Sequence, residues 1–248
     1  MDNSRLTSKE TWRSHWGTKE IQRISRNYSF HELLIGAASK VTTGNKCIEL
    51  GGFPGYFSVF LRKYASLDPS LIDFVVHENF INELLVANEL RTEDIQRIQD
   101  DIFNYEPVIK YDLVCSFGLM EHFTDISSII KAHVKYMKPG GILLITVPNF
   151  LGVNGLLQYL FDPKNLAIHN LKSMNIDPIK QCMIDCGLTV IEADYYPSTQ
   201  VWLEDIDKRG ILLKIGMRVL DKFMKFLGAV FGKKNKILSN NVYWIAKL

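Results

Sequence analysis

A glycine-rich segment between an apolar run and a helical stretch constrains the fold more than any other feature of the chain. The apolar run 46–48 ends at the acid Glu49, three glycines follow within six residues, and residues 56–65 have the apolar spacing of a helix. This order predicts a strand, a tight turn and a helix. Open α/β sheets use such a unit to bring bare backbone against a nucleotide-like cofactor at the carboxyl end of the first strand. Glycine is needed there because the backbone turns sharply or approaches a ligand closely.

The spacing of the glycines excludes the usual dinucleotide-binding pattern. In Gly-x-Gly-x-x-Gly counted from Gly51, the second glycine would fall on Phe53, which also disfavours an NAD-dependent enzyme. The pattern acid-x-Gly-x-Gly-x-Gly fits Glu49, Gly51 and Gly55, with Phe53 again replacing the middle glycine. Here the chain resembles the class I S-adenosylmethionine-dependent methyltransferases, whose first motif has this acid and this spacing. Pro54 restricts Phe53 to extended backbone, so this departure bears on how tightly the turn would hold a cofactor.

Further segments match the same family in order and at similar spacing. Residues 70–75 predict a second strand ending near Asp73, where a carboxylate can accept the protons of both ribose hydroxyls. Residues 100–103 resemble the element in which an acid faces the exocyclic amine of adenine. Residues 110–123 resemble the fourth-strand signature, and residues 137–147 resemble the turn into the fifth strand. The resemblance is close from about residue 45 to residue 150.

The resemblance implies S-adenosylmethionine as the cofactor and assigns residues to it. For the methionine and ribose end it implies Glu49, Gly51, Gly52, Phe53, Gly55, Asp73 and Phe74. For adenine, and for backbone contacts near the methionine, it implies Asp101, Ile102, Ser116 and Phe117. Purely structural roles are the alternative: Asp73 as a solvated acid at a strand end, and Asp101 as an acid that caps a turn.

Two histidines are candidates for the chemistry. Methyl transfer from a sulfonium is an in-line displacement in which the protein mainly positions the acceptor, and a hydroxyl acceptor must also lose its proton to a base. His122, just after the fourth predicted strand, is the first candidate because imidazole titrates near neutrality, although it could also only shape the loop around the cofactor. His169 is the second candidate. Some quinone-pathway O-methyltransferases recruit magnesium through Asp/Glu-x-x-Glu-His here; Gly118 replaces the first acid, so we expect no metal.

The acceptor is expected to be a small molecule or a glycan. Residues 116–119 lack the Asn/Asp-Pro-Pro-aromatic motif of enzymes that methylate exocyclic amines of nucleic acids. Outside residues 208–236 the chain has 20 basic and 26 acidic residues, which opposes binding to a phosphate backbone, so we expect no nucleic acid partner. Residues 147–158 resemble methyltransferases of bacterial surface-polysaccharide and specialised-metabolite pathways. We therefore expect O-methylation in biosynthesis (EC 2.1.1 class); N-methylation and a catalytically silent, methyltransferase-like binding module are the alternatives.

Alternating strand and helix patterns predict an α/β fold. We expect a Rossmann-like, doubly wound sheet of seven strands, mostly parallel, with an antiparallel last strand. The expected strands are 46–50, 70–76, 95–99, 111–116, 142–148, 187–196 and 241–248. The expected helices of this core are 55–66, 78–90, 125–137 (opened by Thr124 or Asp125) and 175–186.

An N-terminal helical cap, residues 1–44, is expected to precede the methyltransferase domain, residues 45–248. Ser29 and Glu32 form a capping-box pattern for a helix near 30–40. Residues 12–17, which include two tryptophans, either cover the edge of the cofactor or simply pack.

Two stretches are longer than the bare fold needs. They are about 149–174 and 197–240, and insertions at the ligand side of such a sheet build substrate pockets and lids. The second contains a basic segment, 208–236, with nine Lys or Arg residues, one acid, and apolar residues three and four apart. This pattern predicts a basic amphipathic helix or pair of helices. It could pack on its own domain or a homodimer mate, dock on an anionic membrane or a lipid-linked substrate, or bind nucleic acid.

The start of the chain gives an expectation about location. Residues 1–20 are polar and lack the apolar stretch of a signal peptide, and no run approaches the ~20 apolar residues of a membrane span. We therefore expect a cytoplasmic protein that could also be peripheral to the membrane.

Overall fold

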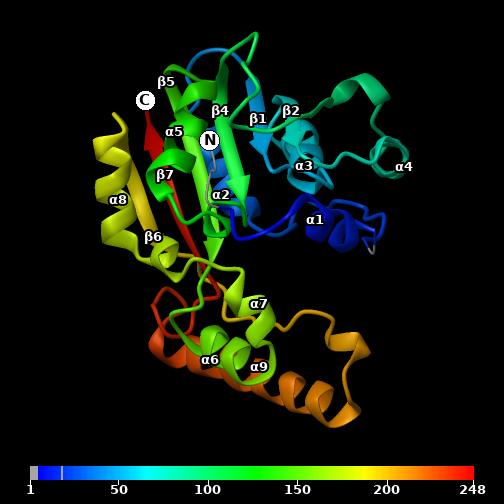
Figure 1. Ribbon diagram of the computed structural model, residues 1–248, viewed down its shortest axis with the longest axis vertical. Coiled ribbons are helices and arrows are strands. Elements are labelled where there is room, and N and C mark those ends of the chain that lie inside the picture. Colours follow the sequence, from blue (N-terminus) through cyan, green and yellow to red (C-terminus); the bar gives the residue numbers. More distant parts are fainter. Residues whose placement is uncertain (1–4, 18) are drawn as a thin grey trace.

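A seven-stranded sheet forms the centre of the molecule in the computed structural model (Figure 1). The structure describes residues 5–17 and 19–248; residues 1–4 and 18, which belong to the expected cap, lie outside the described residues. The strand order is β3-β2-β1-β4-β5-β7-β6. The strands are β1 (Lys46–Leu50), β2 (Asp68–Asp73), β3 (Gln96–Gln99), β4 (Tyr111–Phe117), β5 (Met137–Pro148), β6 (Thr189–Tyr195) and β7 (Asn241–Lys247).

The direction of the strands confirms the expected topology. Strands β1 to β5 pair in parallel, whereas β7 runs antiparallel to both β5 and β6. The chain order reverses between β1 and β4, so the carboxyl ends of these two strands flank the crevice in which open α/β sheets bind their ligands. Strand β5 begins at Met137, five residues earlier than expected, because a register irregularity in its pairing with β4 lets the turn at 139–141 extend the strand.

Helices cover both faces of the sheet because its buried strands are apolar on both sides. One core combines α2, α3 and α4 with alternate residues of the strands, such as Cys47 and Leu144. The opposite core combines α5 and α8 with the intervening residues, such as Ile48 and Leu143. The helices are α1 (Lys9–Trp16), α2 (His31–Ala38), α3 (Tyr56–Tyr64), α4 (Glu78–Ala87), α5 (Ile126–Tyr136), α6 (Val153–Phe161), α7 (Pro163–Ala167), α8 (Ile176–Asp185) and α9 (Ile211–Phe231). Short 3₁₀ helices are Thr92–Asp94, Met120–His122, Leu171–Met174 and Ile206–Lys208.

The ends of two helices test the expected caps. Asp125 caps α5 as expected, since its side chain accepts a hydrogen bond from the Ser128 backbone N–H at 3.0 Å. The prediction that Ser29 and Glu32 form a capping box is wrong. Helix α2 instead follows Phe30, which has a left-handed backbone (φ 59°) and no side-chain cap, and whose ring packs at 4.8 Å from that of Tyr196. Packing of this aromatic side chain thus fixes the entry of the helix, in place of a polar cap.

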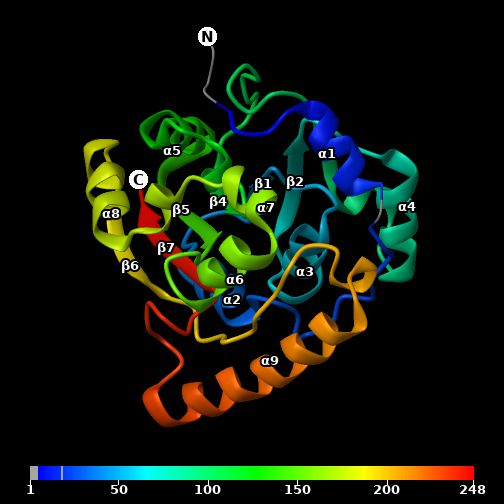
Figure 2. The same ribbon diagram turned by 60° about the horizontal axis from the view of Figure 1, so that its bottom comes forward.

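The two long insertions fold together beyond the carboxyl ends of the strands. Helices α6 and α7 follow β5, and α9 follows β6 (Figures 1 and 2). A third, small apolar core joins them, and the Asn149 amide ties them further by donating to the carbonyls of Lys236 and Ser239, both at 2.8 Å. None of the described helices is both long and apolar enough to cross a membrane.

Candidate functional site

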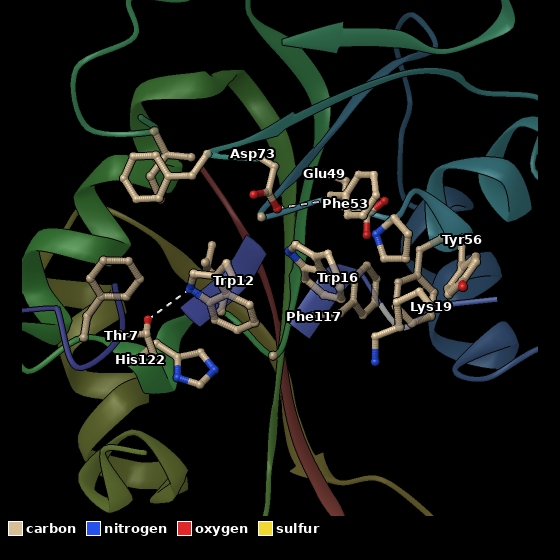
Figure 3. A pocket seen from close by; sticks show the side chains of 18 of the residues that line it. Thr7, Trp12, Trp16, Lys19, Glu49, Phe53, Tyr56, Asp73, Phe117 and His122 are labelled. Atoms are coloured by element: carbon tan, nitrogen blue, oxygen red, sulfur yellow. Dashed lines mark hydrogen bonds between the residues drawn. The ribbon is translucent and has the colours of Figure 1, made fainter. Parts of the chain in front are cut away.

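A cavity of about 330 Å³ lies at the carboxyl ends of β1, β2 and β4, and residues of the N-terminal segment close it from the other side (Figure 3). Its volume is at the lower end of the range for small-molecule sites. Aromatic side chains dominate its wall, and the polar lining residues include three acids and one histidine. The lining residues are Arg5, Thr7, Trp12, Trp16, Lys19, Gln22, Tyr28, Glu49, Gly51, Phe53, Pro54, Tyr56, Phe57, Asp73, Phe74, Asp100, Ile102, Phe117, Gly118, Leu119, His122 and Phe123.

The turn between β1 and α3 has no room for larger side chains. Gly51 and Gly55 have positive φ angles of 66° and 94°, a backbone that other residues adopt only with strain. A Cβ on Gly52 would lie 2.8 Å from both the Glu49 carbonyl oxygen and the Leu71 Cβ. Gly51 lines the cavity, whereas Gly52 and Gly55 shape the turn from behind it. The turn therefore presents bare backbone to the cavity, as a close-fitting cofactor site requires.

Glu49 is buried at the end of β1 and faces the cavity (Figure 3). Its Oε2 accepts hydrogen bonds from the Ser58 backbone N–H at 3.0 Å and from the Ser58 hydroxyl at 2.6 Å. Burial raises the pKa of Glu49 to about 8 because desolvation penalises the carboxylate more than these two donors stabilise it. A positively charged group placed beside Glu49 would reverse this balance and favour the carboxylate.

Asp73 ends β2 and holds the glycine-rich turn in place. One carboxylate oxygen accepts from the Phe53 backbone N–H at 3.2 Å, and the other accepts from the Val75 N–H at 3.0 Å. Burial raises the pKa of Asp73 to about 6, although these backbone donors act in the opposite direction. An acid that is fixed in this way, on the wall of the cavity, can accept further hydrogen bonds from a diol.

The segment after β3 has an arrangement that the sequence did not indicate. The guanidinium of Arg5 forms an ion pair with Asp101 at 2.5 Å and lies 4.0 Å from the centre of the Phe74 ring. Asp101 Oδ1 also accepts from the Phe103 backbone N–H at 3.0 Å. The neighbouring acid, Asp100, lines the cavity instead of Asp101. Phe74 and Ile102 supply apolar surface at the same end of the cavity.

Ser116 lies behind the cavity wall. Its side chain is fully buried, and the hydroxyl donates to Nε2 of His133 at 2.9 Å, since Nδ1 of His133 donates to the Ile129 carbonyl at 2.7 Å. Burial lowers the pKa of His133 to about 4, which keeps this imidazole neutral. The next residue, Phe117, does line the cavity and stacks on Phe57 with ring centres 4.0 Å apart.

The two candidate histidines lie side by side after β4. The rings of His122 and His169 are 4.7 Å apart, and only His122 is on the cavity wall. His122 Nδ1 lies 2.9 Å from the Ile168 carbonyl oxygen, which can only accept, so Nδ1 carries the proton and Nε2 carries the lone pair. Glu121 is buried beside them, with Oε1 4.0 Å from Nε2 of His122. Burial raises the pKa of Glu121 to about 8 and lowers that of His169.

These three side chains also form a potential metal-binding group. Glu121, His122 and His169 each offer one ligand atom, and the three atoms lie within 4.8 Å of one another. Two imidazoles and one carboxylate suit a transition metal better than magnesium, which prefers several oxygen ligands. His169, which completes this group, comes from the first insertion and is distant in sequence. The expectation that no metal takes part therefore stays a prediction.

The N-terminal segment closes the cavity. The Leu6 N–H donates to the His122 carbonyl at 2.9 Å, and Arg5 forms a β-bridge with Phe123. Trp12 and Trp16 of α1 stack with ring centres 5.4 Å apart, and both line the cavity (Figure 3). Of the two alternatives for these tryptophans, the structure thus supports a cover for the site. Thr7, Lys19 and Gln22 contribute to the same wall, and no sequence pattern indicated them.

The residues around the cavity fit S-adenosylmethionine. Gly51 of the glycine-rich turn lines the cavity without a side chain, so bare backbone is available to the methionine part. Buried acids at the ends of β1 and β2 match its ammonium group and its ribose hydroxyls, and the aromatic wall matches a sulfonium and a purine.

Comparisons with known proteins agree with this geometry. Residues 21–193 match the family model described as a methyltransferase domain. The fold is similar to that of *Haemonchus contortus* phosphoethanolamine N-methyltransferase 2 in complex with S-adenosylmethionine, with a TM-score of 0.57 and 18% identity over 87% of this chain. This chain spans about half of that chain, 52%.

Two further solved structures have similar lengths. An S-adenosylmethionine-dependent methyltransferase from *Archaeoglobus fulgidus* has a TM-score of 0.55 and 15% identity, covering 88% of this chain and 94% of its own. An S-adenosylmethionine-dependent methyltransferase from Mesorhizobium loti has a TM-score of 0.55 and 12% identity, and the match covers 90% of this chain and 99% of that one. At these identities the likeness shows a shared fold. No curated protein sequence matches. The family match covers more than half of the chain, and this protein therefore belongs to the class I S-adenosylmethionine-dependent methyltransferases.

Proposed function

We propose that this protein transfers the methyl group of S-adenosylmethionine to a hydroxyl group of a small molecule or glycan, with His122 as the base. The observation that carries the proposal is the position of His122 on the wall of the cavity that also contains the glycine-rich turn and Glu49. A base must lie within hydrogen-bond reach of the proton that it removes, and His122 is the cavity-lining residue best suited to that task near neutral pH.

The cofactor supplies an activated methyl group on a positive sulfur. The protein's contribution is then to hold the acceptor in line with that group and to exclude water. Trp12, Trp16 and Phe117 surround the space with aromatic surface, and cations are stabilised over such rings. Glu49 would hold the ammonium group, Asp73 the ribose hydroxyls, and Phe74 and Ile102 the adenine. Asp100 is better placed than Asp101 to meet the adenine edge, since Arg5 occupies Asp101.

The proton path follows from the hydrogen bonds of His122. Because Nδ1 donates to the Ile168 carbonyl, the ring is held in one orientation. Nε2 can then take the proton from the hydroxyl group that receives the methyl group. The imidazolium that forms would lie 4.0 Å from Oε1 of Glu121. Its positive charge would favour ionisation of this buried acid, and the resulting carboxylate would stabilise the imidazolium. The ring of His169 lies 4.7 Å from that of His122 and outside the cavity wall, so it would act by positioning His122. No step in this path needs a metal ion, so treatment with EDTA should leave the activity unchanged.

An amine is the second candidate acceptor. The observation that favours it is the likeness to phosphoethanolamine N-methyltransferase 2 of *H. contortus*, which has also been solved with phosphomonomethylethanolamine and S-adenosylhomocysteine. A protonated amine must lose a proton before it can attack, so the same base at His122 would serve.

Label transfer tests the proposal. The protein would be incubated with S-adenosylmethionine labelled in its methyl group and with separate panels of sugars, phenols and primary or secondary amines. Transfer to a hydroxyl compound that is lost in His122→Ala is the expected result. Transfer only to amines would select the second candidate. Calorimetry with S-adenosylmethionine and with NAD separates the remaining cases: binding of S-adenosylmethionine without transfer to any panel or extract indicates a binding module, and no binding overturns the cofactor sites.

A further inference from the structure

Helix α9 has two apolar faces, and only one of them is covered by the protein. Its inner face contributes Met217 and Met224 to the small core of the insertions. Its outer face carries a row of large apolar side chains spaced three or four residues apart, each of them 50–65% exposed. We call this row the α9 stripe: Ile211, Ile215, Val219, Phe223, Phe226 and Val230.

The exposed apolar surface extends beyond this row. Leu212 and Phe231, at the two ends of α9, are 82% and 72% exposed. Helix α6 of the other insertion exposes Leu156, Tyr159 and Leu160. An aligned row of exposed apolar side chains such as the α9 stripe marks an interaction site, because scattered single residues would show no such alignment. Figures 1 and 2 show α9 along one end of the molecule, away from the sheet.

A row of basic residues borders the α9 stripe. Arg218, Lys222 and Lys225 are exposed on α9, and Lys233 and Lys236 are exposed just after it. Among the described residues, Arg218, Lys222, Lys233 and Lys236 form no ion pair, and Lys225 pairs with Asp221 on the same helix at 2.6 Å. At 100° per residue, Arg218 falls beside the stripe next to Ile211, and Lys222 falls between Ile211 and Ile215 at the same side of the stripe. Both charges therefore lie along this side of the apolar surface, from which long side chains can reach an anionic layer.

We propose that α9 docks this protein on an anionic lipid bilayer surface, with the α9 stripe in the interfacial region and the basic row against the headgroups. A helix with a broad apolar face and bordering Lys and Arg residues has the pattern of helices that lie in the plane of a membrane surface. Charge decides against a second copy as the occupant. The segment 208–236 has nine cations and one acid, so pairing with itself would bring like charges together and neutralise almost none of the positive charge.

Docking through α9 would orient the site. The insertions leave the sheet at the carboxyl ends of β5 and β6, the same edge at which the cavity lies. The edge that holds the cavity would therefore face the membrane side of the molecule (Figure 1).

Vesicle binding tests the proposal with the full-length protein. Flotation would compare vesicles of phosphatidylcholine alone with vesicles of 70% phosphatidylcholine and 30% phosphatidylglycerol. The wild-type protein should bind the anionic vesicles at least about tenfold more tightly, and more weakly at high salt, since Lys and Arg near an anionic surface add affinity that salt screens. Two variants separate the two parts of the surface: Phe223→Ser with Phe226→Ser removes apolar side chains, and Arg218→Glu with Lys222→Glu reverses charge. Each should reduce binding to anionic vesicles by at least about tenfold.

Matched controls come from exposed positions elsewhere. Val86→Ser with Val108→Ser removes apolar side chains that are more exposed than Phe223 and Phe226, and Lys131→Glu with Lys180→Glu reverses two exposed charges on α5 and α8. Both should bind vesicles like the wild type, and an unchanged melting temperature would show that all variants fold. The proposal is overturned if the wild type ignores anionic vesicles, or if α9 variants and controls bind equally. It is also overturned if the wild type is a dimer that Phe223→Ser with Phe226→Ser dissociates without any vesicle binding, or if the basic row retains nucleic acid and not vesicles.

Discussion

Arg5 and Asp101 form an ion pair across 96 residues of chain and thereby fasten the N-terminal segment over one end of the cavity. The guanidinium also lies against the ring of Phe74, and both charged side chains are largely buried. The contact therefore has two consequences. It closes the site, and it occupies the carboxylate that the family pattern assigns to adenine.

Removal of this contact should open the site. Arg5→Ala is expected to speed dissociation of S-adenosylmethionine about tenfold, because a largely buried, charge-assisted hydrogen bond contributes about 1.5–3 kcal/mol. Stopped-flow or surface plasmon resonance measures the dissociation rate. The rate for Arg5→Lys should lie between those of the wild type and Arg5→Ala. Slower dissociation in Arg5→Ala would instead mean that Arg5 competes with adenine for Asp101. A double-mutant cycle with Asp101→Asn measures the coupling.

Glu49 should release a proton when the cofactor binds. With a pKa of about 8, this buried acid is mostly protonated at pH 7, and an ammonium group beside it would lower that pKa. Binding at pH 7 should therefore release close to one proton, and affinity should rise from pH 6 to 8. Calorimetry in two buffers of different ionisation enthalpy counts the protons. Glu49→Gln should lose most of this release, whereas exposed Glu83→Gln should keep it; equal release in both variants would contradict the role of Glu49.

Substitution of His122 and substitution of His169 should have different effects on the kinetics of methyl transfer. His122→Ala is expected to lower kcat by about 10²–10⁴-fold, the usual contribution of a general base, with little change in cofactor affinity. His169→Ala should cost less, about tenfold, and should leave the pH–rate profile in place, because His169 lies behind His122. If His169→Ala removes the rise of activity with pH that a general base produces and His122→Ala does not, the two assignments are reversed.

Stability should depend on pH through Glu121. Its pKa of about 8 in the folded protein exceeds the ordinary value of 4.5, so the folded state retains a proton that the unfolded chain releases. The free energy of unfolding should therefore fall as the pH rises from about 5 to 8, to which Glu49 adds in the same direction. Glu121→Gln should flatten this slope and raise the melting temperature at pH 8 by a few degrees, as thermal unfolding across this range would show. Glu83→Gln serves as the exposed control. An unchanged slope in Glu121→Gln would contradict the raised pKa of Glu121.

The parts of the site that could be predicted are those set by local pattern. Glu49 and Asp73 end apolar strands, and in a parallel sheet those ends meet at one edge, so their place on the cavity wall followed from the sequence. Arg5 could not be predicted, because its contact with Asp101 depends on how a segment without periodic pattern crosses the sheet. His169 was a candidate from the sequence, but its position against the ring of His122 could not be predicted, because the fold of the first insertion brings it there. Helix α9 was expected to be amphipathic, but periodicity alone could not show that two of its faces are apolar and only one is covered.

Gly52 offers a test of the close-packed turn. A Cβ there would lie 2.8 Å from the Glu49 carbonyl oxygen and from the Leu71 Cβ, neither of which is the end of a flexible side chain. Gly52→Ala should therefore destabilise the protein by about 1–3 kcal/mol and weaken cofactor binding, since the backbone of the turn must shift. Gly36→Ala is the matched control, because a Cβ at this position in α2 meets nothing within 4 Å. It should stabilise the protein by about 0.5–1 kcal/mol, the helical preference for alanine over glycine. Denaturant unfolding with and without S-adenosylmethionine measures both effects, and equal stability of the two variants would contradict the packing described for the turn.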